Sequence, residues 1–155
     1  AAEFGGGSGE NLPYALYGGS GSLTEFDGLL SGRTTDSLVR AIELANILGP
    51  SARMLEAAGL LGSTRDGMAG VLLRFEKIMG DVIRFHGGMT PDTYGLFNIR
   101  ALAEKFPLAA MPGVLKATHE AVARTAGGNL AAVADMFAIT VSEVMYNAKS
   151  SGRKV

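Results

Sequence analysis

The chain has 155 residues, 47% of them apolar, and a formal net charge of −1, and a chain of this length forms a single domain with its own core. Cysteine is absent, which excludes disulfides, thiolate metal ligands and cysteine nucleophiles, and no apolar run approaches the roughly eighteen residues of a membrane span. With two histidines and no motif for catalysis or metal binding, the sequence predicts a protein that is not an enzyme and holds no cofactor or metal.

The N-terminal residues 1–30 differ from the rest in composition. Residues 1–22 contain seven glycines and three serines, and glycine loses more backbone freedom on ordering than any other residue. We therefore expect an extended Gly/Ser-rich arm that becomes ordered against a neighbouring subunit. Pro13 disfavours a helix interior or a central strand. The anchors in the neighbour would be Leu12, Pro13, Tyr14, Leu16 and Tyr17.

A second interpretation of this arm is an engineered linker, because GGGSG and GGSGS on either side of a short peptide are typical of cloning spacers. The arm carries Glu3, Glu10, Glu25 and Asp27 without a basic residue, which leaves residues 31–155 with a formal charge of +3. The arm is therefore acidic and the body mildly basic. We expect the acidic arm to face protein rather than nucleic acid.

Helical periodicity and helix breakers alternate through residues 31–148. A first helix begins at Thr34 or Thr35 and ends at about Leu48, before Gly49-Pro50; a second runs from Ser51 to about Leu61. The strongest prediction is a helix from Arg65 to Phe85, with apolar residues at three- and four-residue steps over about five turns. The remaining predicted helices run from Thr90-Pro91 to about Phe106, from Met111 to Ala126 and from Asn129 to Ala148.

No sustained period-two pattern predicts a strand. The expected fold is an all-α bundle of five or six helices over residues 31–148, followed by a basic C-terminal tail, residues 149–155. Within the last predicted helix, Ala134, Ala138, Ile139 and Val144 fill the small and apolar positions of a helix-turn-helix. The spacing resembles that motif of phage-type repressors over about twenty residues. A straight amphipathic helix is the other interpretation of the same segment.

Basic residues are spread along the body, but three of them share one side of the strongest helix. At 100° per residue, Arg74, Lys77 and Arg84 fall within an arc of about 80°, where they could contact phosphates. In a repeating polymer a few weak contacts recur in every subunit. Ordinary solvated surface charges are the other interpretation. The candidate nucleic-acid-binding residues are Arg65, Arg74, Lys77, Arg84, Lys149, Arg153 and Lys154.

A helical body, a glycine-rich arm, a mildly basic body and no catalytic motif together resemble the major coat (capsid) proteins of filamentous archaeal viruses. The resemblance is architectural and spans the whole chain. It implies a virion subunit that dimerises with itself or a related subunit and wraps double-stranded DNA, in an A-like form, without reading base sequence. Two alternatives remain: a cytoplasmic helix-turn-helix-type DNA-binding regulator or adaptor, and a protein-only structural or secretion-system component.

Overall fold

The computed structural model describes residues 13–14, 16–17, 35–50 and 54–153, and every regular element in these ranges is helical. The elements are α3 (Thr35–Ile47), α4 (Met54–Leu61), α5 (Arg65–His86), α6 (Ile99–Lys105), the 3-10 turn η2 (Leu108–Ala110), α7 (Met111–Thr125) and α8 (Leu130–Arg153). The predicted all-α bundle is confirmed.

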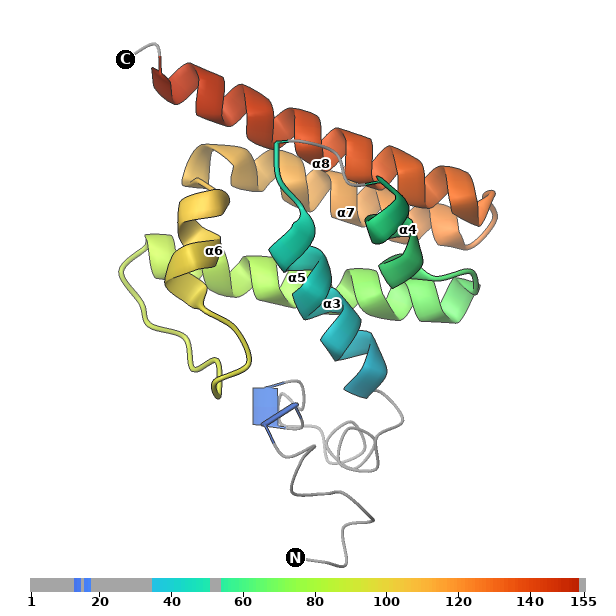
Figure 1. Ribbon diagram of the computed structural model, residues 1–155, viewed down its shortest axis with the longest axis horizontal. Coiled ribbons are helices and arrows are strands. Elements are labelled where there is room, and N and C mark those ends of the chain that lie inside the picture. Colours follow the sequence, from blue (N-terminus) through green and yellow to red (C-terminus); the bar gives the residue numbers. More distant parts are fainter. Residues whose placement is uncertain (1–12, 15, 18–34, 51–53, 154–155) are drawn as a thin grey trace, which may run out of the picture.

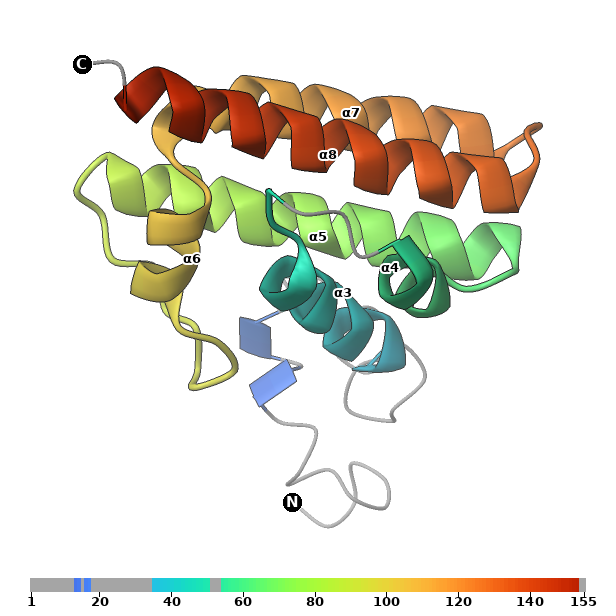
Figure 2. The ribbon, with the colours of Figure 1, turned by 45° about the horizontal axis from the view of Figure 1, so that its top comes forward.

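Helix α5 is the central element of the bundle. It packs against α3, α6 and α7, while α7 packs against α8 (Figures 1 and 2). A four-residue connection, residues 126–129, turns the chain so that α7 and α8 lie side by side. At the centre of the core, the Phe75 ring of α5 makes edge-on contacts with Phe106 and Phe137, with ring centroids 6.4 Å and 5.6 Å apart. These rings join α5 to the end of α6 and to α8.

The predicted starts of α5 and α8 are confirmed, and side-chain caps explain both. The Thr64 hydroxyl accepts a hydrogen bond from the amide of Gly67 at the start of α5 (3.1 Å), and the Asn129 side chain accepts one from the amide of Ala132 at the start of α8 (3.1 Å). Each oxygen satisfies an amide that has no partner within its own helix. Helix α8 continues to Arg153, so Lys149 is helical rather than part of a separate tail.

The prediction of a helix beginning at Thr90-Pro91 is wrong in its first half. Residues 87–98 form turns and irregular backbone, and within them Tyr94 and Gly95 adopt positive φ angles of 52° and 76°, which a right-handed helix does not allow. The helix starts only at Ile99, where the Asn98 side chain accepts a hydrogen bond from the amide of Ala101 (3.0 Å). A threonine-proline pair favours a helix start, but here the glycine turn that follows overrides it.

The helix-turn-helix interpretation of residues 133–144 is also wrong. The whole segment lies inside α8, a helix of 24 residues without an internal turn. Ala134 and Ala138 are buried in the bundle, where small residues allow close helix packing. The amphipathic-helix interpretation of this segment is therefore correct.

Of the expected anchor residues in the arm, four lie within the described ranges, and Leu12 lies outside them. Pro13, Tyr14, Leu16 and Tyr17 have helical rather than extended backbone. The expectation of an extended conformation is wrong for these four residues.

Candidate functional site

The candidate site is the polar side of α5, where the predicted cations lie around a buried carboxylate. The Arg84 side chain is 54% exposed and that of Lys77 35%, whereas Asp81 between them is only 8% exposed. Lys77, Asp81 and Arg84 are separated by one helical turn each, so all three side chains meet on the same side of the helix. This spacing creates a pair of cations around one anion.

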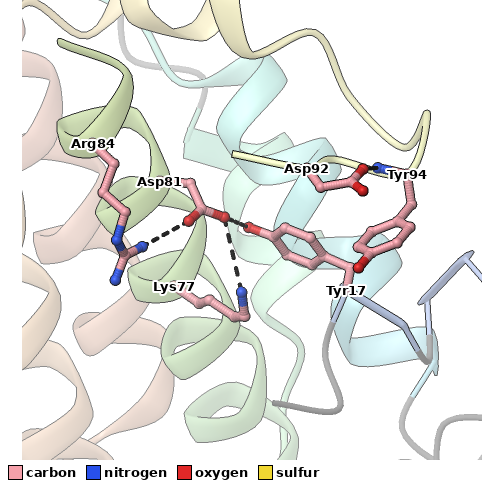
Figure 3. A network of polar contacts seen from close by, with 6 residues as sticks. All are labelled: Tyr17, Lys77, Asp81, Arg84, Asp92 and Tyr94. Atoms are coloured by element: carbon pink, nitrogen blue, oxygen red, sulfur yellow. Dashed lines mark hydrogen bonds and ion pairs between the residues drawn. The ribbon is translucent and has the colours of Figure 1, made fainter. Parts of the chain in front are cut away.

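Asp81 accepts contacts from three side chains, as Figure 3 shows. Arg84 Nη1 donates to Asp81 Oδ1 at 2.7 Å, and Lys77 Nζ lies 3.8 Å from Asp81 Oδ2. The third partner is Tyr17 from the N-terminal segment, whose hydroxyl donates to Asp81 Oδ2 at 2.5 Å. A carboxylate held by two hydrogen-bond donors and a nearby ammonium group is tolerated at this depth because its charge is compensated.

Tyr17 attaches to the bundle the part of the chain before α3 that the structure describes, residues 13–14 and 16–17, called here the N-terminal segment. Its side chain is 3% exposed, its ring packs edge-on against Phe97 with centroids 5.3 Å apart, and Lys77 Nζ lies 4.0 Å from the ring centroid. A cation over an aromatic face at this distance is attractive. Burial, followed by the hydrogen bond to Asp81, holds the pKa of Tyr17 far above its ordinary value of 10.0.

Within the chain described, Tyr17 is bound to α5. Its expected role as an anchor in a neighbouring subunit stays a prediction. Sequence reasoning missed Asp81 and Phe97. The spacing of Lys77, Asp81 and Arg84 at i, i+4 and i+7 could have indicated the role of Asp81. No local sequence pattern pairs residue 17 with residue 97.

The other predicted cations do not join this cluster. Arg65 donates to the carbonyl of Thr125 at the end of α7 (2.7 Å), and it lies 19 residues before Arg84, about 28 Å away along α5. Arg74 donates to the carbonyl of Gly70 in its own helix (3.3 Å). Lys149 is exposed on α8. Arg153 is the last residue of α8, and Lys154 lies outside the described residues.

A groove of about 480 Å³ runs between α5 and α7 beside this cluster. Its lining combines apolar and charged side chains: Leu73, Glu76, Lys77, Gly80, Arg84, Leu115 and His119. Across it, His119 Nε2 lies 3.1 Å from Glu76 Oε2, and Leu73 is 51% exposed. The groove is open to solvent on the same side of α5 that carries Lys77 and Arg84.

Comparisons with protein-family models, with curated proteins and with solved structures found no match to this chain. Among the residues that the structure describes, no group of three or more His, Cys, Asp or Glu side chains is placed to hold a metal ion. None of the described helices is both long enough and apolar enough to cross a membrane.

Proposed function

We propose that this chain is a structural subunit of a helical assembly, a coat protein that wraps double-stranded DNA without reading its sequence and resides in a virion. Its partners are further copies of itself or of a related subunit. The proposal joins the architectural resemblance described above to two properties of the described surface: exposed apolar side chains and a line of cations on α5.

The observation that carries the proposal is the exposure of large apolar side chains on several separate elements. Eight such side chains are exposed among the described residues: Leu16, Leu55, Leu73, Met89, Tyr94, Leu108, Met136 and Tyr146. Apolar surface of this kind favours protein contacts. Where two different surfaces of one protein are complementary, head-to-tail contacts that do not close into a ring generate a helical array.

Two of these surfaces suit such a contact. On α8, Met136 and Tyr146 are 52% and 60% exposed. Tyr146 borders a groove of about 430 Å³ with Ile139 and Pro50, and Met136 lies on the flank of α8 next to α7. On α5, the exposed Leu73 lines the groove between α5 and α7. Because the two surfaces belong to different helices, each subunit can engage one neighbour through each surface.

The contact with DNA is supported by the charge on α5. Lys77 and Arg84 lie against the buried Asp81, and Arg74 adds a third cation to the same helix, where it donates to the carbonyl of Gly70. Because Lys77 and Arg84 face the single carboxylate of Asp81, the net charge of the cluster is positive. Contacts between such cations and phosphates do not depend on base sequence. With residues 133–144 in a straight helix, the feature that suggested a sequence-specific regulator is removed.

The protein-only assembly remains a second candidate function, and a specific observation favours it. Lys77 and Arg84 are already engaged by Asp81, so a phosphate has to compete with a carboxylate for both cations. In this alternative the apolar surfaces assemble the subunits and no nucleic acid is bound.

The deciding experiment is electron microscopy of the purified protein with and without long random-sequence duplex DNA, at low and moderate salt, followed by nuclease digestion. A DNA coat predicts uniform filaments that form only with DNA and protect it. Filaments without DNA identify the protein-only assembly, and the absence of filaments in every sample contradicts both. The variant Met136→Ser/Tyr146→Ser should lose filaments, whereas Asp135→Ser, a control at an exposed position of α8, should retain them.

A further inference from the structure

Lys77, Asp81 and Phe97 form a receptor for one tyrosine side chain, which we call the Tyr17 socket. Asp81 binds the hydroxyl at 2.5 Å, Lys77 covers the ring at 4.0 Å and Phe97 meets it edge-on at 5.3 Å. Lys77 and Asp81 lie on α5 and Phe97 in the irregular segment before α6, whereas the occupant, Tyr17, precedes α3 in the chain and reaches α5 from there (Figure 3).

The chain between Tyr17 and the body is long. Residues 18–34, the connecting segment, separate Tyr17 from the start of α3 at Thr35 and number 17 residues. Fully extended, this segment spans about 60 Å, whereas a domain of this size has a radius of gyration of about 15 Å and hence a diameter of about 40 Å. Tyr17 of one copy can therefore reach the socket of an adjacent copy without any change in the bundle.

We propose that the Tyr17 socket is an interaction surface for a second copy of this chain, so that neighbouring subunits exchange their N-terminal segments through it. This inference rests on the proposed function, because exchange requires subunits held close together. The contacts of Tyr17 are the same within a chain as between chains, as in domain swapping. The balance depends on concentration: a partner in the same chain acts at an effective concentration on the order of millimolar, and packed subunits supply neighbouring sockets at a similar concentration.

The test uses selective isotope labelling of the full-length, unaltered chain. One batch carries ¹³C only in tyrosine and a second only in phenylalanine; the two are mixed in denaturant, refolded together and assembled. Because neither chain carries both labels, a ¹³C–¹³C cross peak between Tyr17 and Phe97 arises only when the tyrosine of one copy occupies the socket of another. A chain labelled in both residue types, diluted into unlabelled protein, shows the contact within a chain.

Exchange predicts the Tyr17–Phe97 cross peak in the mixed-label assembly and its disappearance when the phenylalanine-labelled batch carries Phe97→Leu. A cross peak in the doubly labelled chain alone means that every Tyr17 stays in its own socket, and the proposal is then wrong. Absence of the peak from both samples means that Tyr17 leaves the socket on assembly, which also overturns it.

Failure of the proposed function gives a different result. If no assembly forms under any condition, the coat and protein-only proposals fail, and the same labelled mixture is measured as a concentrated solution. A cross peak there supports exchange independently of any filament, and its absence overturns exchange as well.

Discussion

Asp81 is the only acidic or basic residue among those described that is almost completely buried. Three side chains from two distant parts of the chain converge on it: Tyr17 and Arg84 donate hydrogen bonds, and Lys77 forms an ion pair. Removing one member of a buried charged network leaves the others without compensation, which costs more than the intact network contributes. The attachment of the N-terminal segment to the bundle therefore depends strongly on this one carboxylate.

Replacing that carboxylate by an amide tests its contribution. Asp81→Asn removes the negative charge that Arg84 and Lys77 face, but both cations keep some access to water, so we expect the free energy of unfolding to fall by about 1–3 kcal/mol. Urea denaturation followed by circular dichroism measures the change. The matched control Asp92→Asn, at an exposed turn residue, should shift the free energy by less than about 0.5 kcal/mol. Equal effects of both variants would contradict the role given to Asp81.

The raised pKa of Tyr17 predicts a loss of stability at alkaline pH. Above about pH 10 an unfolded chain releases this proton while the folded chain retains it, so the free energy of unfolding falls by about 1.4 kcal/mol per pH unit. Below that pH the Tyr17 hydroxyl is protonated in both states, so it does not change the free energy of unfolding with pH. Tyr17→Phe should lower the stability by about 1 kcal/mol at neutral pH and remove this part of the alkaline loss. Urea unfolding of both proteins from about pH 9 to about pH 11 compares the slopes; parallel curves would show that Tyr17 is not buried.

At the scale of elements, α7 and α8 approach each other closely at a glycine. A methyl group added at Gly113 of α7 would lie 2.8 Å and 2.9 Å from the two γ carbons of Val144 in α8. Valine has little rotational freedom in a helix, so the helices themselves have to separate. The absence of a side chain at residue 113 thus sets how tightly the two neighbouring helices pack.

Gly113→Ala is expected to destabilise the chain, although alanine is the better helix former. Overpacking costs about 1–3 kcal/mol, which outweighs the helix-propensity gain of about 1 kcal/mol. Gly59→Ala in α4 is the control, since its methyl group meets nothing within 4 Å, and we expect it to raise the melting temperature. Adding Val144→Ala to Gly113→Ala should recover part of the loss. A melting temperature that rises for Gly113→Ala would exclude the close approach.

The helices that periodicity predicts best are those whose ends have capping or helix-terminating residues in the local sequence. Helix α5 has its apolar stripe, the Thr64 cap and a glycine pair after His86, and α8 has the Asn129 cap, so local sequence determines both. The segment before α6 could not be predicted in the same way, because a threonine-proline pair indicates a helix start whether or not a glycine turn follows. Only the positive φ angles at Tyr94 and Gly95 distinguish the two cases.

The candidate site was predictable only in part, for a similar reason. An arc of 100° per residue places Arg74, Lys77 and Arg84 on one side of α5, and the structure leaves their side chains partly or fully exposed there. Whether a cation is free for a ligand depends on contacts between distant segments. The hydrogen bond from residue 17 to residue 81 is one such contact, and helical periodicity carries no information about it.

For the whole molecule, a weak electrostatic surface predicts DNA binding that depends strongly on salt. Removing one phosphate-binding cation should reduce by about 1 the slope of log binding constant against log salt concentration. Arg74→Gln/Lys149→Gln, which leaves the Tyr17 socket intact, should therefore reduce the slope by about 2. Fluorescence anisotropy with labelled duplex DNA measures it, with Arg100→Gln on α6 as the control for an exposed arginine. An unchanged slope would remove these two residues from the DNA contact.

The attachment of Tyr17 also gives the chain a mechanical character. Tyr17 belongs to the same hydrophobic core as the described helices α3–α8, but it joins that core through a single side chain from outside the helices. We therefore expect tension applied before Tyr17 to release this side chain at a lower force than the one that unfolds the bundle. The length of residues 18–34 then limits the separation of Tyr17 from α3 to about 60 Å.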